Sequence, residues 1–343
     1  MTNHKKHFLI FSSIIILLLC TTGLSACTLP NKSANNNLSD TRFYLDTYTT
    51  ITIYGCSDRE ILDGAFEVIK KYHNIFSRTL ESSEVNKINH SGQTTIQMSA
   101  PLSELLRTGL DYCEMTDGAF NIAIGRESSL WDFNADTPAP PAPEAVKNAL
   151  SHIDYHNLSM KESTLTRTDP ELWLEFGGIA KGYIADRVRD YLVENGVESA
   201  YIDLGGNILC IGSKPDGSDF NIGIAKPFDE NRTPFLVVPI SDYSVVTSGI
   251  DQRYFEKDGT FYHHILDPST GYPVENDLLS VTILSPKSID GDALSTSCFV
   301  LGKEKGTELV DSLDDIYAVF IDKDYNITYS EGTLEHFDLK EYH

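Results

Sequence analysis

The chain has 343 residues, of which 41% are hydrophobic and 22% are charged, and this composition excludes a wholly disordered protein. Its 27 basic and 50 acidic residues give a formal net charge of −23, which disfavours nucleic-acid binding because the phosphate backbone would be repelled. A phosphorylated ligand would need a local positive group, such as a metal ion, a helix N-terminus or a lysine.

The first 26 residues are typical of a targeting segment that is not part of the fold. Two lysines precede an almost wholly apolar run over 8–24, and small residues lead up to Cys27. This pattern resembles a bacterial lipoprotein signal, so we expect lipidation of Cys27 and anchoring at the extracytoplasmic face of the cell membrane. An uncleaved transmembrane helix is the alternative, because the run is nearly long enough to span a bilayer. Residues 27–41 are polar and are predicted to form a tether.

The remaining chain, 42–343, mixes strands and helices without regular βαβ alternation. In chain order we expect a strand over 43–55, helices over 61–75 and 101–115, a short strand over 173–176, a helix over 179–194, short strands through 200–285, helices over 288–301 and 303–313, and a hairpin over 316–329. Residues 77–92 and 137–143 are expected to be irregular. Without the alternation of a doubly wound sheet, the pattern favours an α+β fold.

Four cysteines of this region are widely spaced and form no Cys-x-x-Cys pair. They are Cys56, Cys113, Cys210 and Cys298. A zinc cage or a thioredoxin-type motif is therefore not expected, and we predict that these cysteines are small buried hydrophobic residues.

The segment from Glu175 to Lys181 is the first candidate site, because it joins a predicted strand to a helix through Gly177 and Gly178. Paired glycines let a backbone approach a ligand closely, and a helix N-terminus offers unpaired N–H groups to an anion. Lys181 falls in the first turn, where the helix dipole disfavours a cation, so it indicates a phosphate partner. A plain strand-turn-helix with a solvated lysine is an equally open alternative.

Asp292 and Thr296 form a second candidate site near the start of the helix predicted over 288–301. Residues four apart on a helix share a face, so the carboxylate and the hydroxyl point the same way. Together they suit a hard cation such as Mg²⁺, which takes oxygen ligands. On the residues alone, a helix cap and a side-chain hydrogen bond to backbone is the stronger alternative.

His263 and His264 end a predicted strand and precede a tight turn over 267–271. Neighbouring residues of a strand point to opposite faces, so one histidine can line a site while the other meets solvent. A histidine can act as a general base near neutral pH. The commoner alternative is an ordinary surface or core histidine.

Taken in order, these segments resemble the ApbE family, the FAD:protein FMN transferases. The resemblance runs from about residue 43 to residue 329 and is carried by Gly-Gly-Ile-Ala-Lys-Gly-Tyr at 177–183, Gly-Gly-Asn at 205–207, His-Ile-Leu-Asp-Pro-Ser-Thr-Gly at 264–271 and Asp-Ala-Leu-Ser-Thr at 292–296. It implies a T-fold-like α+β architecture in one compact catalytic unit over 42–343, with two lobes flanking the ligand as a further option.

The resemblance also implies a reaction. Such enzymes cleave the pyrophosphate of FAD, transfer FMN to a serine or threonine hydroxyl of a partner protein and release AMP. The implied cofactor is Mg²⁺, which would neutralise the pyrophosphate and make the attacked phosphorus more electrophilic. The implied partners are extracytoplasmic flavoproteins that carry a short Ser/Thr-containing motif.

Individual residues take roles from the same resemblance. The metal ligands would be the side chains of Asp292 and Thr296 and the backbone carbonyls of Gly178 and Ser295. The positions expected to contact FAD are Leu45, Thr79, Ala119, Phe120, Asn121, Trp131, Glu175, Lys181 and Leu266, with Trp131 as a stacking surface. His264 would accept the proton of the acceptor hydroxyl, and Asp292 competes with it for that role.

Three positions depart from the family pattern and put the ligand geometry in doubt. The family usually has Asp where this chain has Glu175, often has Asp in place of Asn121, and in some members has Tyr where this chain has Thr79. Glu175 would make a longer or altered contact to the ligand, Asn121 would remove a charge near the flavin, and Thr79 would lack a stacking contact. One expected consequence is weaker retention of FAD.

Three other functions stay open on the sequence. The same site could split FAD to FMN and AMP with water as the acceptor, because the acceptor protein is not in this chain. A non-enzymatic FAD-binding lipoprotein is disfavoured by the paired metal ligands, since binding alone does not need them. A solute-binding lipoprotein of another fold is disfavoured by the lack of a two-lobed βα pattern.

Overall fold

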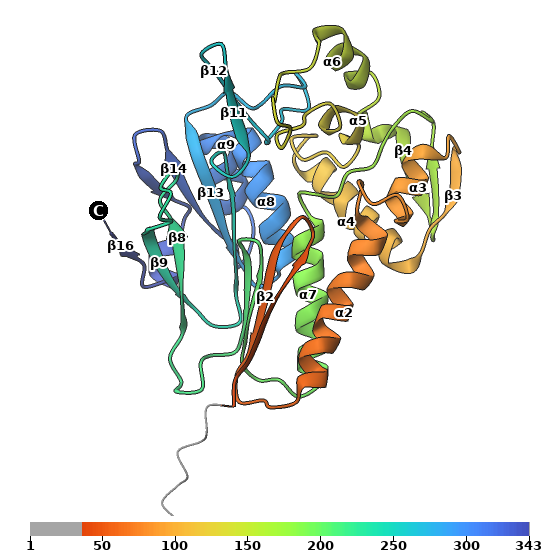
Figure 1. Ribbon diagram of the computed structural model, residues 1–343. Coiled ribbons are helices and arrows are strands. Elements are labelled where there is room, and N and C mark those ends of the chain that lie inside the picture. Colours follow the sequence, from red (N-terminus) through yellow and green to blue (C-terminus); the bar gives the residue numbers. More distant parts are fainter. Residues whose placement is uncertain (1–35, 343) are drawn as a thin grey trace, which may run out of the picture. The chain divides into compact units, whose positions relative to one another are not determined.

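A computed structural model describes residues 36–342 of the chain (Figure 1). The predicted signal segment over 1–26, the predicted lipidation site Cys27 and most of the predicted tether lie outside the described residues. Residues 37–343 group into one compact unit. Within the described part of the chain, no helix combines the length and the apolar character needed to cross a membrane.

An eight-stranded antiparallel sheet runs through this unit. In spatial order its strands are β1 (Leu38–Tyr44), β2 (Thr47–Ile53), β6 (Ala200–Leu204), β7 (Asn207–Ile211), β10 (Ser244–Gly249), β13 (Leu278–Ser285), β14 (Tyr317–Asp322) and β15 (Ile327–Tyr329). All eight residues of β13 are buried, which identifies this strand as the most enclosed part of the sheet.

Three small sheets surround the large one. They are β3 (Thr95–Gln97), β5 (Thr164–Arg167) and β4 (Leu158–Lys161); β16 (Lys340–Glu341), β9 (Pro234–Ile240) and β8 (Phe220–Ala225); and the hairpin of β11 (Tyr254–Lys257) and β12 (Thr260–His263). The helices are α2 (Arg59–Phe76), α3 (Glu84–His90), α4 (Ala100–Met115), α5 (Gly125–Ser128), α6 (Pro143–Leu150), the 3₁₀ helix η1 (Tyr155–Asn157), α7 (Ala180–Glu194), α8 (Ser288–Leu301), α9 (Lys303–Asp311) and α10 (Thr333–His336). Together these elements make a mixed α+β fold.

The two faces of the large sheet belong to two separate apolar cores, because side chains alternate along a strand. On β14, Ala318 and Phe320 point into the larger core with the helices, whereas Val319 and Ile321 join a smaller core with β8 and β9. Helix α8 packs on β10 and β13, and α7 packs between α8 and α2 (Figure 1). The helix that carries Asp292 is therefore held by the most enclosed strand of the sheet.

Helices α7 and α8 approach each other very closely where Gly182 meets the start of α8. A Cβ atom at Gly182 would lie 2.3 Å from the carbonyl oxygen of Ser288, so only glycine fits there. Asp186, one turn later, accepts hydrogen bonds from the N–H groups of Ser288 and Ile289, both at 3.0 Å. This carboxylate caps α8 from a neighbouring helix and fixes the two candidate segments against each other.

Most predicted helices are confirmed to within a few residues, but two N-terminal predictions are wrong. The strand predicted over 43–55 is a hairpin, because Leu45 and Asp46 both have positive φ (56° and 57°) and reverse the chain. Strand β1 also begins at Leu38, before the predicted start at residue 42. The hydroxyls of Thr41 and Thr50, 2.8 Å apart, add a side-chain contact to this pairing.

Two further segments differ from the prediction. Residues 84–90 form α3 within a stretch predicted to be irregular, because Ser83 caps the helix through a hydrogen bond from the N–H of Asn86. The strand predicted over 173–176 joins no sheet. The cysteine prediction is confirmed, since all four thiols are free, three of them are buried and Cys56 is partly buried.

Candidate active site

Asp292 on α8 and the glycine turn before α7 meet at the centre of the candidate site. Asp292 is only 3% exposed, and its Oδ2 accepts a hydrogen bond from the backbone N–H of Gly182 at 2.9 Å. Thr296 lies one turn further along α8, and a Cβ atom placed on Gly178 would be 3.6 Å from its Oγ1. The structure therefore gathers the predicted metal-ligating residues, with Ser295 adjacent to Thr296 on the same helix.

Lys181 pairs with Asp292 in this structure. Its Nζ lies 3.3 Å from Oδ1 of Asp292. The carboxylate offsets the unfavourable position of a cation in the first turn of α7, which the sequence analysis explained by a phosphate partner. The Lys181 side chain is 29% exposed, so its ammonium group can also contact an anionic ligand that binds at this carboxylate.

Hydroxyl groups complete the surroundings of Asp292. Ser248 Oγ lies 2.9 Å from Ser295 Oγ and 3.2 Å from Thr296 Oγ1, and Ser295 Oγ donates to the backbone oxygen of Asp292 at 3.1 Å. Over the described residues, no group of three or more His, Cys, Asp or Glu side chains gathers. One carboxylate with hydroxyls and carbonyls fits a hard cation such as Mg²⁺ that keeps waters or phosphate oxygens, and it does not fit zinc.

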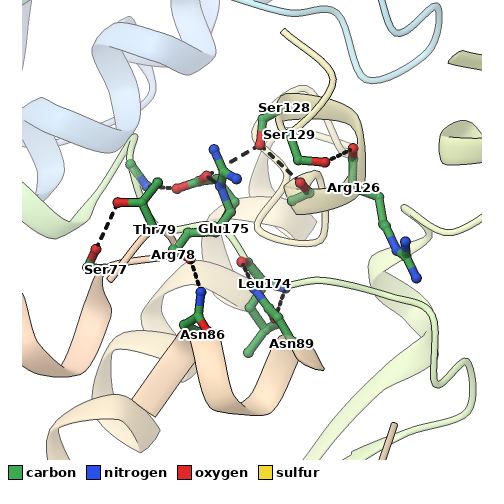
Figure 2. A network of polar contacts seen from close by, with 12 residues as sticks. Ser77, Arg78, Thr79, Asn86, Asn89, Arg126, Ser128, Ser129, Leu174 and Glu175 are labelled. Carbon is green, nitrogen blue, oxygen red and sulfur yellow. Dashed lines mark hydrogen bonds and ion pairs between the residues drawn. The ribbon is translucent and has the colours of Figure 1, made fainter. Parts of the chain in front are cut away.

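Glu175 lies at the entrance to the glycine turn, and protein groups use both of its oxygens (Figure 2). Its Oε2 forms an ion pair with Arg78 Nε and accepts a hydrogen bond from Ser128 Oγ at 3.3 Å. Its Oε1 accepts a hydrogen bond from the backbone N–H of Gly177 at 2.8 Å. The side chain predicted to contact FAD is thus already bound on both oxygens by the protein.

The residues before Glu175 are held on one side by side chains that bind their backbone groups. The amide of Asn89 accepts a hydrogen bond from the N–H of Leu174 at 2.8 Å and donates one to its carbonyl oxygen at 2.9 Å (Figure 2). The buried guanidinium of Arg167 donates to the carbonyl oxygen of Leu172 at 2.7 Å. On its other side the segment pairs with residues 122–125, through an isolated bridge between Ile124 and Trp173 and a hydrogen bond from the Glu175 N–H to the Ile122 carbonyl oxygen at 2.8 Å. Side chains and this short pairing together satisfy the backbone of the predicted strand over 173–176.

Three residues predicted on the flavin side follow α4. Phe120 is buried, and its ring lies 3.2 Å from the position that a Cβ atom on Gly178 would take. Asn121 uses its amide internally, because Nδ2 donates to the carbonyl oxygen of Ile153 and Oδ1 accepts from the N–H of Ala123. Ala119 lines a groove of about 580 Å³ between residues 115–119 and 267–269.

Trp131 lies in a small aromatic cluster with Phe133, Phe255, Tyr262 and Tyr272. Phe133 is parallel to the indole, with ring centroids 5.8 Å apart, and Trp131 is only 6% exposed. The predicted flavin stacking surface is therefore largely covered by other rings of the chain.

The indole N–H of Trp131 is shared between Oε1 of Glu127 at 3.1 Å and the carbonyl oxygen of Gly271 at 3.2 Å. Glu127 is fully buried, and its other oxygen has no hydrogen-bond partner among the described residues. Burial raises the pKa of this carboxyl to about 7, against the weaker opposing effect of the indole hydrogen bond.

His264 follows β12, and its backbone N–H donates to the carbonyl oxygen of Arg253 at 3.1 Å. Desolvation is the main cause that lowers the pKa of His264 to about 3, and Arg253, His263 and Lys181 lower it further, in that order. Its Nδ1 is buried and has no hydrogen-bond partner in the described part of the chain. His264 is therefore neutral at physiological pH, whereas His263 is tied to the carbonyl oxygen of Val274.

The remaining predicted FAD contacts lie at the edges of this region. Leu45 occupies the turn between β1 and β2 and packs against the larger core. Leu266 is buried beside Trp131 and pairs with Pro273 in an isolated bridge. The hydroxyl of Thr79 lies 3.3 Å from Ser77 Oγ, next to Arg78.

The sequence analysis does not identify Arg78, Ser128 or Glu127. Arg78 stands in a polar run without periodicity, and its partner Glu175 is 97 residues away, so no local signal could reveal the pair. Glu127 stands four residues before Trp131, the spacing at which helical side chains meet, and that spacing could have indicated it.

Comparison with known proteins gives a consistent result. Residues 45–321 match the model of the ApbE family. An FAD:protein FMN transferase of Treponema pallidum is 32% identical over 94% of this chain and 93% of its own length. An FAD:protein FMN transferase of Klebsiella pneumoniae is 38% identical over 80% of this chain and 85% of its own length.

Solved structures of similar proteins share the fold. The ApbE protein of Thermotoga maritima matches with a TM-score of 0.80 and 30% identity, over 88% of this chain and 99% of that one. A flavinyl transferase ApbE of Pseudomonas stutzeri matches with a TM-score of 0.78 and 27% identity, over 88% of this chain and 96% of that one.

Proposed function

We propose a magnesium-dependent reaction for this site, from the premise that the chain belongs to the ApbE family and is an FAD:protein FMN transferase. In this proposal the transferase cleaves the FAD pyrophosphate, moves FMN to a serine or threonine hydroxyl of a flavoprotein and releases AMP. The observation that carries it is the meeting of Asp292, Thr296 and the Gly178 turn.

The proposed metal ligands are Asp292, Thr296, Gly178 and Ser295. A bound Mg²⁺ would supply Lewis-acid activation of the phosphorus and would neutralise the leaving phosphate. Lys181 supports this assignment, because an ammonium 3.3 Å from Asp292 is placed to contact a phosphate brought to the same carboxylate. The backbone N–H of Gly182 orients the carboxylate through its other oxygen.

We assign the acceptance of the hydroxyl proton to His264. In its neutral state the imidazole has one nitrogen with a free lone pair that can accept the hydroxyl proton, and its Nδ1 has no hydrogen-bond partner among the described residues. Asp292 is the competing base, but its oxygens contact Lys181 and the Gly182 N–H. A variant His264→Ala should lose transfer more than FAD binding.

The setting of the reaction is also proposed. The lipoprotein-like start of the sequence supports lipidation at Cys27 and action at the extracytoplasmic face of the cell membrane, on flavoproteins located there. The T-fold-like arrangement with two lobes around the ligand belongs to the same proposal and rests on the family resemblance.

Intact mass measurement tests the reaction directly. The purified chain is incubated with FAD, Mg²⁺ and an extracytoplasmic flavoprotein domain, with and without chelator. A gain of one FMN by the acceptor, lost on chelation, is the expected result. Release of FMN and AMP with no acceptor gain would indicate hydrolysis, and bound FAD with neither product would indicate a binding protein.

A further inference from the structure

The charge pair of Arg78 and Glu175 stands directly before the glycine turn, and both side chains are largely buried. Arg78 is 22% exposed and Glu175 is 20% exposed. The backbone oxygen of Arg78 accepts a hydrogen bond from Asn86 Nδ2 at 2.7 Å, so the first residue of the pair is fixed to α3 (Figure 2). Charge-assisted hydrogen bonds of this kind are stronger than neutral ones.

The pair reaches the turn through the second oxygen of the carboxylate. Glu175 Oε1 accepts from the N–H of Gly177, and a Cβ atom on Gly177 would lie 3.1 Å from that oxygen. The backbone of the turn therefore lies directly against the Glu175 carboxylate. Gly178, the next residue, faces Phe120 and Thr296.

The other end of the segment is already fixed by α3, because Asn89 holds both backbone groups of Leu174. Backbone hydrogen bonds to residues 122–125 hold the segment as far as Glu175, whose N–H donates to the carbonyl oxygen of Ile122 at 2.8 Å. Beyond Glu175 no strand pairing continues among the described residues, so the path of the backbone into the site depends on side-chain contacts. At Glu175 those contacts come from Arg78 and Ser128.

We propose that Arg78 and Glu175 act as a positioning pair that sets the Gly177–Gly178 turn for the metal and for FAD. Neither is a catalytic residue in this proposal. Arg78 holds the carboxylate, the carboxylate holds the Gly177 N–H, and the turn then presents Gly178 beside Thr296. This inference rests on the proposed function of the site, because it assumes that Gly178 serves FAD and the metal.

The test compares Arg78→Ala and Arg78→Lys with Arg126→Ala in the full chain. Arg126 is a matched control, because it forms an ion pair with Glu171 in the same region (Figure 2 shows its side chain) and contacts neither glycine. Its guanidinium lies 4.5 Å from the ring centre of Trp173, so it also controls for the loss of a contact to this segment that does not pass through Glu175. Three quantities are measured: Mg²⁺ affinity by titration calorimetry, FAD affinity in chelator by flavin fluorescence, and the melting temperature.

Arg78→Ala should weaken Mg²⁺ binding by about ten-fold, the usual effect of removing a group that orients a metal ligand. It should also weaken FAD binding without metal, with a small change in melting temperature. Arg78→Lys should recover part of both affinities, and Arg126→Ala should leave both unchanged. Wild-type affinities for both ligands in folded Arg78→Ala would overturn the inference.

A double variant tests whether Arg78 acts through Glu175. The Gln side chain of Glu175→Gln keeps an oxygen for the Gly177 N–H but loses the charge. Adding Arg78→Ala to Glu175→Gln should change FAD affinity by less than about two-fold, since coupled residues are not additive. Fully additive losses would contradict the pairing. If the wild-type chain binds no Mg²⁺, the metal proposal fails, and the FAD measurement in chelator still decides the positioning role.

Discussion

Glu127 gives the sharpest quantitative prediction, because it is a fully buried carboxyl with one oxygen unpartnered among the described residues. Burial raises its pKa from 4.5 to about 7. Below pH 4.5 the group is protonated in both the folded and the unfolded state, so it carries no penalty. As the pH rises from 4.5 to 7, the carboxyl ionises in the unfolded state but keeps its proton in the folded state, so stability is lost; above pH 7 the loss is complete.

The size of this loss follows from the two pKa values. Their difference corresponds to about 3 kcal/mol, of which about 2.5 kcal/mol falls between pH 5 and pH 8. Glu127→Gln removes the ionisation and keeps an oxygen for the indole N–H of Trp131. The variant should therefore gain about 2.5 kcal/mol relative to the wild type between pH 5 and pH 8.

Denaturant unfolding at both pH values measures this difference, with tryptophan fluorescence as the signal. Glu194→Gln, at an exposed glutamate near the end of α7, is the matched control and should show no such change. An equal stability difference between Glu127→Gln and wild type at pH 5 and pH 8 would refute the argument from burial.

Three further predictions concern the site. Asp292→Ala should abolish FMN transfer, because the carboxylate serves the proposed metal site, and it should also lower the melting temperature, because the buried N–H of Gly182 loses its acceptor. Transfer near the wild-type rate in the folded variant would reject the metal assignment. Gly182→Ala should cost about 3 kcal/mol or prevent folding, since its methyl would meet the Ser288 carbonyl oxygen at 2.3 Å, and calorimetric melting measures this. The pKa of His264, followed by NMR from pH 3 to pH 8, should rise when FAD binds in chelator, because the anionic pyrophosphate opposes the positive charges that lower it; an unchanged pKa would show that those charges do not face the ligand.

Sequence patterns located the candidate site because its chemistry lies in short segments. Asp292 and Thr296 share one face of α8, and the glycine pair precedes α7 as expected, so local spacing was enough for both. What brings the two segments together is the cap that Asp186 gives to α8. That contact joins residues about a hundred positions apart and leaves no periodic signal.

Local structure was misjudged where a side chain or an unusual turn replaced the usual backbone pattern. Leu45 takes a left-handed conformation that sequence statistics assign to Gly or Asn, so the hairpin over 38–53 could not be seen as two strands. The extended segment over 173–176 has the composition of a strand, but it forms only an isolated bridge to Ile124 on one side, and the amide of Asn89 binds the backbone of Leu174.

Two basic side chains face His264 although the whole chain carries −23. Desolvation is the main cause of the lowered pKa of His264, and the charges of Arg253 and Lys181 lower it further. The same two positive side chains would attract an anionic pyrophosphate. A pyrophosphate bound beside Lys181 and Arg253 would oppose their contribution, so we expect the proton affinity of His264 to increase when FAD is bound.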